Sequence, residues 1–365
     1  MSTASSTTGA VPSVAGTVST PAGSRPRWQF LDVLRGFAVL GILLVNSIDI
    51  TELGMTRAME GAAVVPDPVQ DALYLTVQTR FVPIFVFLFG VSLWIVLDGA
   101  RGRARYPWLV MVRRLVGLAV LGGILALVYP GNVLLEYSVL GLVVLPVVAL
   151  VPRWATLGAG VLLTVVSYAL FGGGLAATPG LILLGAGAAA YGLPRLLETS
   201  TRGVAVGFAL AAVATLPALW WQLSAPGDPR FTTPGGIAGL VMAVGYVTGL
   251  ALLWRTPARR AIVAVFEPLG RMALTNYVAA AIVMALAARV VDFGHMTTVT
   301  PVLLLSVAVI AAQSVLSRLW LARFVYGPVE WVWRTATWLR PAAVLREAPR
   351  SRARRTEGTT RADAS

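Results

Sequence analysis

Ten apolar stretches, each roughly 20 residues long, occupy almost the whole chain between residues 28 and 322. A helix of about that length crosses the hydrocarbon core of a bilayer. The composition, 57% hydrophobic and 12% charged, is also unlike that of a soluble globular protein. The sequence therefore predicts an all-α polytopic integral membrane protein, a bundle of about ten transmembrane helices. The expected spans are 28–49, 79–98, 108–129, 132–151, 154–171, 178–196, 204–222, 235–254, 270–290 and 300–322.

The distribution of arginine predicts how this bundle is oriented. Loops on the cytoplasmic side of a membrane protein carry most of its positive charge. With a cytoplasmic N-terminus, the arginines that face outward are only Arg57, Arg80, Arg230 and Arg289. Both termini are therefore expected inside. The chain has no lysine and is rich in Ala, Val, Leu and Gly, which hints at a GC-rich bacterial genome and hence at the bacterial cytoplasmic membrane.

Composition also divides the chain and limits its chemistry. Residues 1–27 are mostly Ser, Thr, Ala, Gly and Pro and are expected to be a disordered tail. Residues 28–340 form the transmembrane domain, and 341–365 form a basic, disordered tail that contacts anionic lipid. The net charge of +13 lies in short loops between spans, so it favours topology over nucleic-acid binding. With no cysteine and one histidine, no metal site is predicted.

The first span carries polar residues that are costly in a membrane. Asp32, Arg35 and Asn46 lie within it, and a charged group there costs about 2.5 to 3.5 kcal/mol on insertion scales. At about 100° per residue they share one face, with Asp32 and Arg35 near the cytoplasmic end and Asn46 near the outer end. These residues either satisfy neighbouring helices or line a functional site.

Several titratable residues are predicted near the outer end of the bundle. Asp49 ends the first span, Asp71 lies in the long outer loop, and Glu136 lies about one turn inside the fourth span. A carboxylate at that depth needs an arginine partner, such as Arg80 or Arg289, or a water-filled cavity. Burial would raise the pKa of Glu136, which suits a general base. His295 normally titrates near neutral pH, but a lone loop histidine is usually incidental.

A second polar group is predicted at the cytoplasmic end. Pro268 suits the first turn of a helix, so the ninth span should start there, with Arg271 at the boundary and Thr275 and Asn276 one turn deeper. The expected partners of Thr275 and Asn276 are the Asp32 and Arg35 side chains. Residues 326–334 predict a short interfacial helix that carries Arg334. These inner arginines could hold a phosphorylated cofactor, although the positive-inside bias alone would place many of them there.

Three motifs resemble the YeiB-like family of bacterial membrane proteins, domain-of-unknown-function family 418. They are LDVLRGFAVLGILLVN at 31–46, GRMALTNY at 270–277 and YGPVEWVWR at 326–334. NVLLEYSVLG at 132–141 looks like a fourth family block, although the family commonly has Gly-Asp where this chain has Gly131-Asn132. The resemblance covers residues 28–340, with the motifs in the family's order.

That family is distantly similar to transmembrane acyltransferases of the acyltransferase-3 and heparan glucosaminide acetyltransferase groups. The similarity implies transfer of an acyl group from cytoplasmic acyl-CoA to an outer hydroxyl or amine of a glycan, lipid or small metabolite. Under that interpretation Arg35 and Arg271 meet the acyl-CoA phosphates and Asn46 polarises the thioester carbonyl. The expected cofactor-binding residues are then Asp32, Arg35, Arg271, Thr275, Asn276 and Arg334.

One departure from those enzymes concerns the catalytic base. Acyltransferase-3 proteins typically have histidine near the position of Asn46, and the heparan enzymes have a histidine in the next outer loop, which here has none. Glu136, Asp49, Asp71 or His295 would have to substitute. Two alternatives stay open: a proton-coupled transporter or exporter, in which Asp32, Arg35 and Glu136 form the pathway, and a non-catalytic membrane protein.

Overall fold

A computed structural model describes residues 28–63, 65–340 and 344–345, and the expectations for the 1–27 and 341–365 tails otherwise lie outside these residues. The regular secondary structure of the described residues is helical, apart from one isolated bridge between Phe324 and Leu345. The helices are α1 (Gln29–Ile50), α2 (Met55–Met59), α3 (Pro68–Thr76), α4 (Phe81–Arg101), α5 (Pro107–Leu125), α6 (Val133–Leu150), α7 (Arg153–Phe171), α8 (Thr178–Ala190), α9 (Leu193–Thr199), α10 (Thr201–Ser224), α11 (Thr233–Leu253), α12 (Arg259–Arg271), α13 (Ala273–Val290), α14 (Thr300–Arg323) and α15 (Pro328–Trp338). Three short 3₁₀ turns, η1 (Gly174–Ala177), η2 (Pro229–Phe231) and η3 (Phe293–His295), lie in the connections.

The predicted membrane spans are confirmed. Among the described residues, nine helical segments are long and apolar enough to cross a membrane, and a bent pair supplies a tenth. That pair is η1 with α8, followed by α9 after a bend of 69°. Gly192 lies at the bend with φ of 83°, a conformation that glycine adopts without a side-chain clash. The sixth span is therefore a broken helix instead of the straight one that the apolar run suggests.

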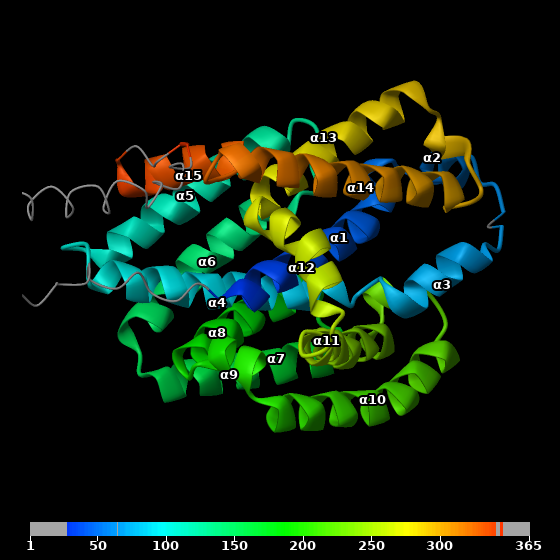
Figure 1. The fold of residues 1–365 in the computed structure, drawn as a ribbon. Coiled ribbons are helices and arrows are strands. Elements are labelled where there is room, and N and C mark those ends of the chain that lie inside the picture. Colours follow the sequence, from blue (N-terminus) through cyan, green and yellow to red (C-terminus); the bar gives the residue numbers. More distant parts are fainter. Residues whose placement is uncertain (1–27, 64, 341–343, 346–365) are drawn as a thin grey trace, which may run out of the picture.

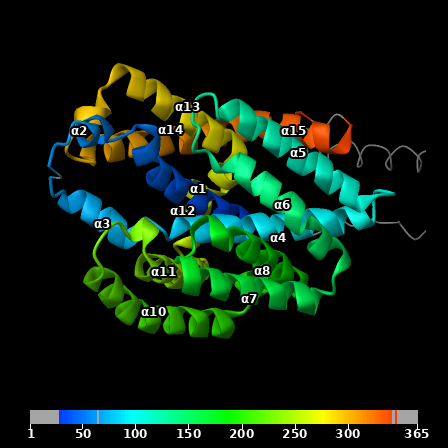
Figure 2. The ribbon, with the colours of Figure 1, turned by 180° about the vertical axis from the view of Figure 1, so that it is seen from behind.

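The first span occupies the centre of the bundle. Figures 1 and 2 show α1 and α4 in the middle, with α13, α14 and α15 on one side and α7, α10 and α11 on the other. In an apolar stretch of 18 residues within α1, 72% of the residues are buried, whereas 17% are buried in the corresponding stretch of α10. A helix buried on all sides by protein can carry polar groups that lipid would exclude. The polar face of α1 therefore lies inside the protein.

The crossing of α1 with α12 depends on two glycines. A Cβ atom at Gly36 would lie 2.0 Å from the carbonyl oxygen of Phe266, and one at Gly270 would lie 1.7 Å from that of Asp32. Small residues let two helix backbones approach closely, as is common between membrane helices. The motifs around Gly36 and Gly270 are therefore two halves of one helix contact.

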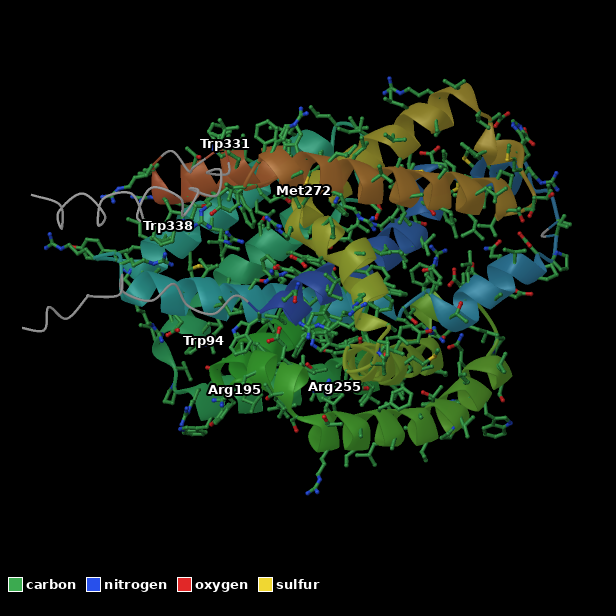
Figure 3. The ribbon with its side chains drawn as sticks, viewed as in Figure 1. Trp94, Arg195, Arg255, Met272, Trp331 and Trp338 are labelled. Carbon is green, nitrogen blue, oxygen red and sulfur yellow. The ribbon has the colours of Figure 1, made fainter. Side chains whose placement is uncertain are left out.

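The start of the ninth span differs from the expectation. Pro268 lies in the last turn of α12, which the sequence analysis did not predict as a separate helix. The chain breaks at Met272 (φ −113°, ψ 31°), and α13 begins at Ala273; Figure 3 shows Met272 at this break. Pro268 lacks a backbone N–H and so weakens the last turn of the helix. The proline at 268 marks an end instead of a beginning.

Candidate functional site

The cytoplasmic end of α1 holds the predicted ion pair. The Arg35 guanidinium donates to the Asp32 carboxylate at 3.1 Å and to the Ser92 hydroxyl of α4 at 2.9 Å. Asp32 is buried and Arg35 is half-buried. The pair thus lies between α1 and α4, with part of Arg35 accessible.

Thr275 has a different partner from the predicted Asp32 and Arg35. The Glu330 carboxylate of α15 accepts from the backbone N–H groups of Leu274 and Thr275, at 2.7 and 3.0 Å, and from the Thr275 hydroxyl at 2.5 Å. These amides belong to the first turn of α13, whose N–H groups have no partner within the helix. Burial raises the pKa of Glu330, although these hydrogen bonds oppose the rise. The carboxylate caps α13 from another helix.

Asn276 also has partners other than Asp32 and Arg35. Its amide nitrogen donates to the Leu269 carbonyl at 3.2 Å and to the Ser317 hydroxyl of α14 at 3.1 Å. The Gln313 side chain of α14 donates to the Asn276 carbonyl at 2.8 Å. The bond to Leu269 satisfies a carbonyl near the end of α12, and the other two join α13 to α14. The predicted cofactor-binding residues Thr275 and Asn276 thus have well-defined structural contacts.

Two of the predicted cofactor-binding arginines lie within electrostatic reach of a third arginine, Arg114. Arg35 and Arg334 both lie close enough to Arg114 of α5 to interact with its charge. The Arg271 guanidinium donates to the Val325 carbonyl, just before α15, at 3.4 Å. The structure therefore brings Arg35 and Arg334 to the same region, and Arg114 is a third arginine there.

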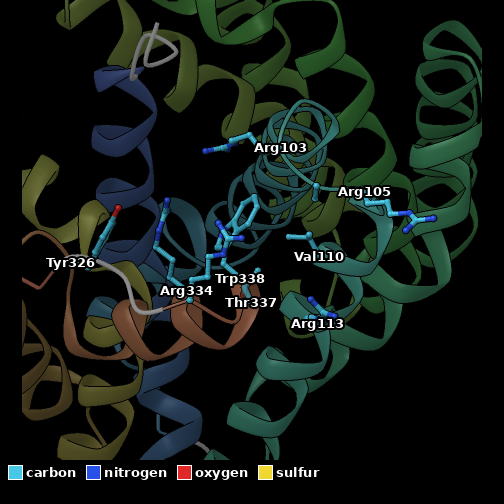
Figure 4. Close-up of a pocket in the computed structure, with 10 residues that line it drawn as sticks. Arg103, Arg105, Val110, Arg113, Tyr326, Arg334, Thr337 and Trp338 are labelled. Atoms are coloured by element: carbon cyan, nitrogen blue, oxygen red, sulfur yellow. The ribbon is translucent and has the colours of Figure 1, made fainter. Parts of the chain in front are cut away.

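A large cavity opens next to this arginine group. Its volume is about 540 Å³, and α15, α5 and the α4–α5 connection form its walls (Figure 4). The arginines that line it are Arg103, Arg105, Arg113, Arg334 and Arg340. Of these, sequence reasoning singled out only Arg334. The positive-inside rule alone explains why arginines occur at this end, whether or not a ligand binds there. The sequence therefore held no signal that marked the other four as lining a cavity.

The outer end of α1 contains an unsatisfied amide. Asn46 is 8% exposed, and its side chain forms no hydrogen bond with another described residue. It lines a cavity of about 10 Å³ together with Tyr277 of α13, a size that holds about one water molecule. The buried hydroxyl of Tyr277 forms no hydrogen bond of normal geometry with a described residue, and its backbone neighbour is Val133 at the start of α6. Sequence reasoning did not select Tyr277, although it ends the GRMALTNY motif.

The predicted carboxylates lie apart from this small cavity's lining. Glu136 is exposed on α6 and forms no hydrogen bond or ion pair with a described residue. Asp49 is exposed and pairs with Arg230 at 3.0 Å. Asp71 is exposed in the first turn of α3. Glu136 lies within electrostatic reach of the hydroxyl of Tyr277, a residue that lines the Asn46 cavity.

Arg80 does not pair with Glu136, which was one predicted alternative. This fully buried guanidinium donates to the Gln78 carbonyl at 2.6 Å, the Thr79 hydroxyl at 2.8 Å and the Gln222 side chain of α10 at 2.6 Å. Neutral acceptors thus satisfy most of its donors. Arg80 joins the start of α4 to α10.

His295 connects two outer loops. Its Nδ1 lies 2.6 Å from the Asp292 carboxylate, and its Nε2 lies 3.5 Å from that of Glu60, in the loop after α1. Asp292, and to a smaller degree Glu60, raise the pKa of His295, because their negative charges favour the imidazolium. The protonated ring attaches one loop to the other, and in that form it has no free lone pair with which to accept a proton.

Replacing Asp292 with asparagine should lower the pKa of His295 towards its ordinary value of 6.5. Because the folded-state pKa is raised, the contribution of this contact to stability is complete below pH 6.5 and is lost as the pH rises through the folded-state pKa. The chain has one histidine, so NMR titration of its ring protons is unambiguous. Glu60→Gln, which removes the longer contact, should cause a smaller fall. An unchanged pKa in Asp292→Asn would contradict this account.

The arrangement has two chemically distinct ends. The inner end has arginines and an open cavity, which suit an anionic ligand. The outer end has an unpaired amide and phenol, which can donate hydrogen bonds to a carbonyl or its oxyanion. Between them, Ala38, Val39 and Ile42 of α1 are buried. The described residues contain no group of three or more His, Asp or Glu side chains that could hold a metal ion.

Sequence comparisons place these features in a family. The family described as "Protein of unknown function (DUF418)" matches residues 193–340, which contain α12, α13 and α15. An uncharacterized 39.9 kDa protein in the amylase 3' region of Bacillus acidopullulyticus is 30% identical over 86% of this chain and 95% of its own length. The uncharacterized YxaH of Bacillus subtilis is 26% identical over 87% of this chain and 96% of its own length.

A third relative completes the comparison. The uncharacterized YeiB of Escherichia coli is 27% identical over 84% of this chain and 95% of its own length. No solved structure matches the chain. Each relative matches more than four fifths of this chain, and the family match includes the α13 and α15 motifs. The chain therefore belongs to the DUF418 family of YeiB-like membrane proteins.

Proposed function

We propose that this protein is a membrane-embedded acyltransferase that takes an acyl group from cytoplasmic acyl-CoA and delivers it to an outer hydroxyl or amine. The observation that carries the proposal is the placement of Asn46: a buried residue whose amide forms no hydrogen bond with a described residue, beside a cavity that Tyr277 also lines. Buried polar groups in a membrane bundle normally find partners, so an amide without one favours a ligand. A thioester carbonyl can accept from both Asn46 and Tyr277.

The two ends of α1 have separate roles in this proposal. Arg35 contributes positive charge to the inner end, where the phosphates of acyl-CoA bind. Asn46 and Tyr277 stabilise the oxyanion that forms when the acceptor attacks the thioester carbonyl. The carbon–sulfur bond then breaks, coenzyme A leaves as the thiolate, and a carboxylate takes the proton of the acceptor. Glu136 is the candidate base, because it lies within electrostatic reach of Tyr277 and has no ion-pair partner among the described residues.

The acyl chain needs a path between these ends. In the structure Val39 and Leu43, both buried, line α1 below Asn46. These side chains must move for an acyl group to pass, so acyl-CoA binding has to be coupled to separation of α1 from α13. Such opening is a small rearrangement at one helix contact of the kind that often limits turnover.

Asn46→Ala and Arg35→Ala should each lose acyl transfer, Asn46→Ala by on the order of 10²-fold, as expected for loss of an oxyanion donor. The assay is transfer of label from acyl-CoA in membranes that contain the protein. Arg57→Ala, which removes an arginine from the outer loop, is the control for a change of charge. Immunoblots of washed membranes confirm equal insertion.

The same variants separate the alternatives. Equal transfer by Asn46→Ala, Arg35→Ala and wild type would overturn the proposal. Proton-coupled uptake into proteoliposomes, without transfer, would identify an exporter instead. The exposure of Glu136 on α6 weighs against a proton path that joins it to Asp32 and Arg35 through the bundle.

A further inference from the structure

The cavity beside α15 concentrates positive charge to an unusual degree. Five of the ten side chains that line it are arginines, and none is acidic. Its walls come from the α4–α5 connection, from α5 and from the last turns of α15, which meet at the end of the molecule that topology places in the cytoplasm. Like charges held at short range repel one another, so this arrangement favours a bound anion.

Aromatic rings hold two of these arginines in position. The Arg334 guanidinium lies 4.9 Å from the centre of the Tyr326 ring, and the Arg103 guanidinium lies 5.0 Å from that of Trp338. Tyr326 and Trp338 themselves line the cavity. An arginine against an aromatic face is oriented by the cation–π interaction, so these donors lose less freedom when a ligand binds.

The wall that carries Arg334 is firmly attached. The indole nitrogen of Trp333 donates to the Arg114 carbonyl at 2.8 Å, and the Arg114 guanidinium covers the same ring at 3.6 Å. Thr337 is fully buried, and its hydroxyl donates to the Trp333 carbonyl at 2.7 Å. The Trp333 and Arg114 contacts dock α15 on α5. The wall that carries Arg334 is therefore a packed helix.

We propose that this cavity binds a ligand with two or more phosphate groups, and that the ligand is the nucleotide part of coenzyme A. Arginine forks fit phosphate oxygens in pairs, and a ring such as Trp338 can stack on a planar base. The identity of the ligand rests on the proposed function, whereas the phosphate chemistry rests on the cavity alone. The shared electrostatic contact of Arg35 and Arg334 with Arg114 links this cavity to the inner end of α1.

The test measures binding of coenzyme A to the full chain in nanodiscs made only of phosphatidylcholine. Wild type should bind, and affinity should fall as salt rises, because exposed charges are screened. Arg334→Ala and Arg103→Ala should each weaken binding about tenfold, the loss expected for one charge-assisted contact. Arg202→Ala removes an exposed arginine at the same end, outside the cavity, and should change affinity less than twofold. Circular dichroism and melting confirm folding.

Three outcomes distinguish the possibilities. If Arg202→Ala weakens binding as much as Arg334→Ala, general charge explains it and the cavity site is wrong. If coenzyme A does not bind, but cardiolipin copurifies with wild type and not with Arg334→Ala, the phosphate site holds and coenzyme A as its ligand is overturned. If coenzyme A binds at the cavity but no acyl transfer occurs, the proposed function fails and this inference stands.

Discussion

Gly270→Ala should prevent stable assembly of the bundle. The new methyl group would lie 1.7 Å from the carbonyl oxygen of Asp32, so α12 has to move away from α1. Overpacking of a tight interface costs typically 1–3 kcal/mol and sometimes more. Here the obstacle is rigid backbone, so we expect a loss of roughly 3 kcal/mol or more. The readout is the temperature at which detergent-extracted protein loses its monodisperse size-exclusion peak.

Gly158→Ala is the matched control, because Gly158 lies within α7 and nothing is within 4 Å of the position of its Cβ. The same substitution there should be neutral or stabilise by up to about 1 kcal/mol, because alanine favours helix over glycine. Gly36→Ala, at the same crossing as Gly270, should resemble Gly270→Ala. A melting temperature for Gly270→Ala equal to that of Gly158→Ala would show that the α1–α12 crossing is looser than described.

Glu330→Ala is expected to have the second largest effect. It leaves the Leu274 and Thr275 amides and the Thr275 hydroxyl without their acceptor. Unsatisfied buried donors cost about 1–3 kcal/mol each, partly recovered by water, so a loss of roughly 3 kcal/mol is expected. In Glu330→Gln the amide oxygen can still accept from the two backbone N–H groups, and the new amide nitrogen can donate to the Thr275 hydroxyl. This variant should melt close to wild type.

The pH dependence of this pair of variants checks the cause. Burial raises the pKa of Glu330 above its ordinary 4.5, so the folded state holds the proton more tightly than the unfolded state. The corresponding stability is complete below pH 4.5 and is lost as the pH rises through the folded-state pKa. As the pH rises from 4.5 through the folded-state pKa, wild type should therefore lose stability relative to Glu330→Gln. A constant difference between the two melting curves would show that Glu330 does not titrate as described.

Hydropathy was sufficient to predict the spans, because each depends on a local apolar run. Span ends in the structure lie within about four residues of the predicted ones, the usual uncertainty of helix ends. Helix α12 was missed because it is amphipathic and short, with Arg259 and Arg260 at its start and Glu267 and Arg271 near its end. Only packing on α1, through Gly36 and Gly270, reveals why this segment is helical and where it ends.

The candidate site was harder to predict than the fold. The polar face of α1 was found because charge within a span is costly wherever it occurs. The predicted partners of Thr275 and Asn276 were wrong. The choice between Asp32 and Glu330 depends on which distant helix docks at the α12–α13 break, and a local pattern does not show this. Tyr277 was missed because a tyrosine in a membrane helix is ordinary, and only the unpaired state of its hydroxyl makes it notable.

The position of α15 has a consequence for how the chain is made. The ribosome delivers α1 first, but α1 packs on α12; Gln29 and Glu267, which hydrogen bond at 2.7 Å, are 238 residues apart. The nascent first helix, with Asp32 and Arg35, must therefore stay at the insertion machinery or beside lipid headgroups until α12 follows. Until α15 has been made, the first turn of α13 lacks its Glu330 cap and the arginine cavity lacks one of its walls. A nascent chain that stops before Gly327 would insert all its spans and still lack the cavity wall.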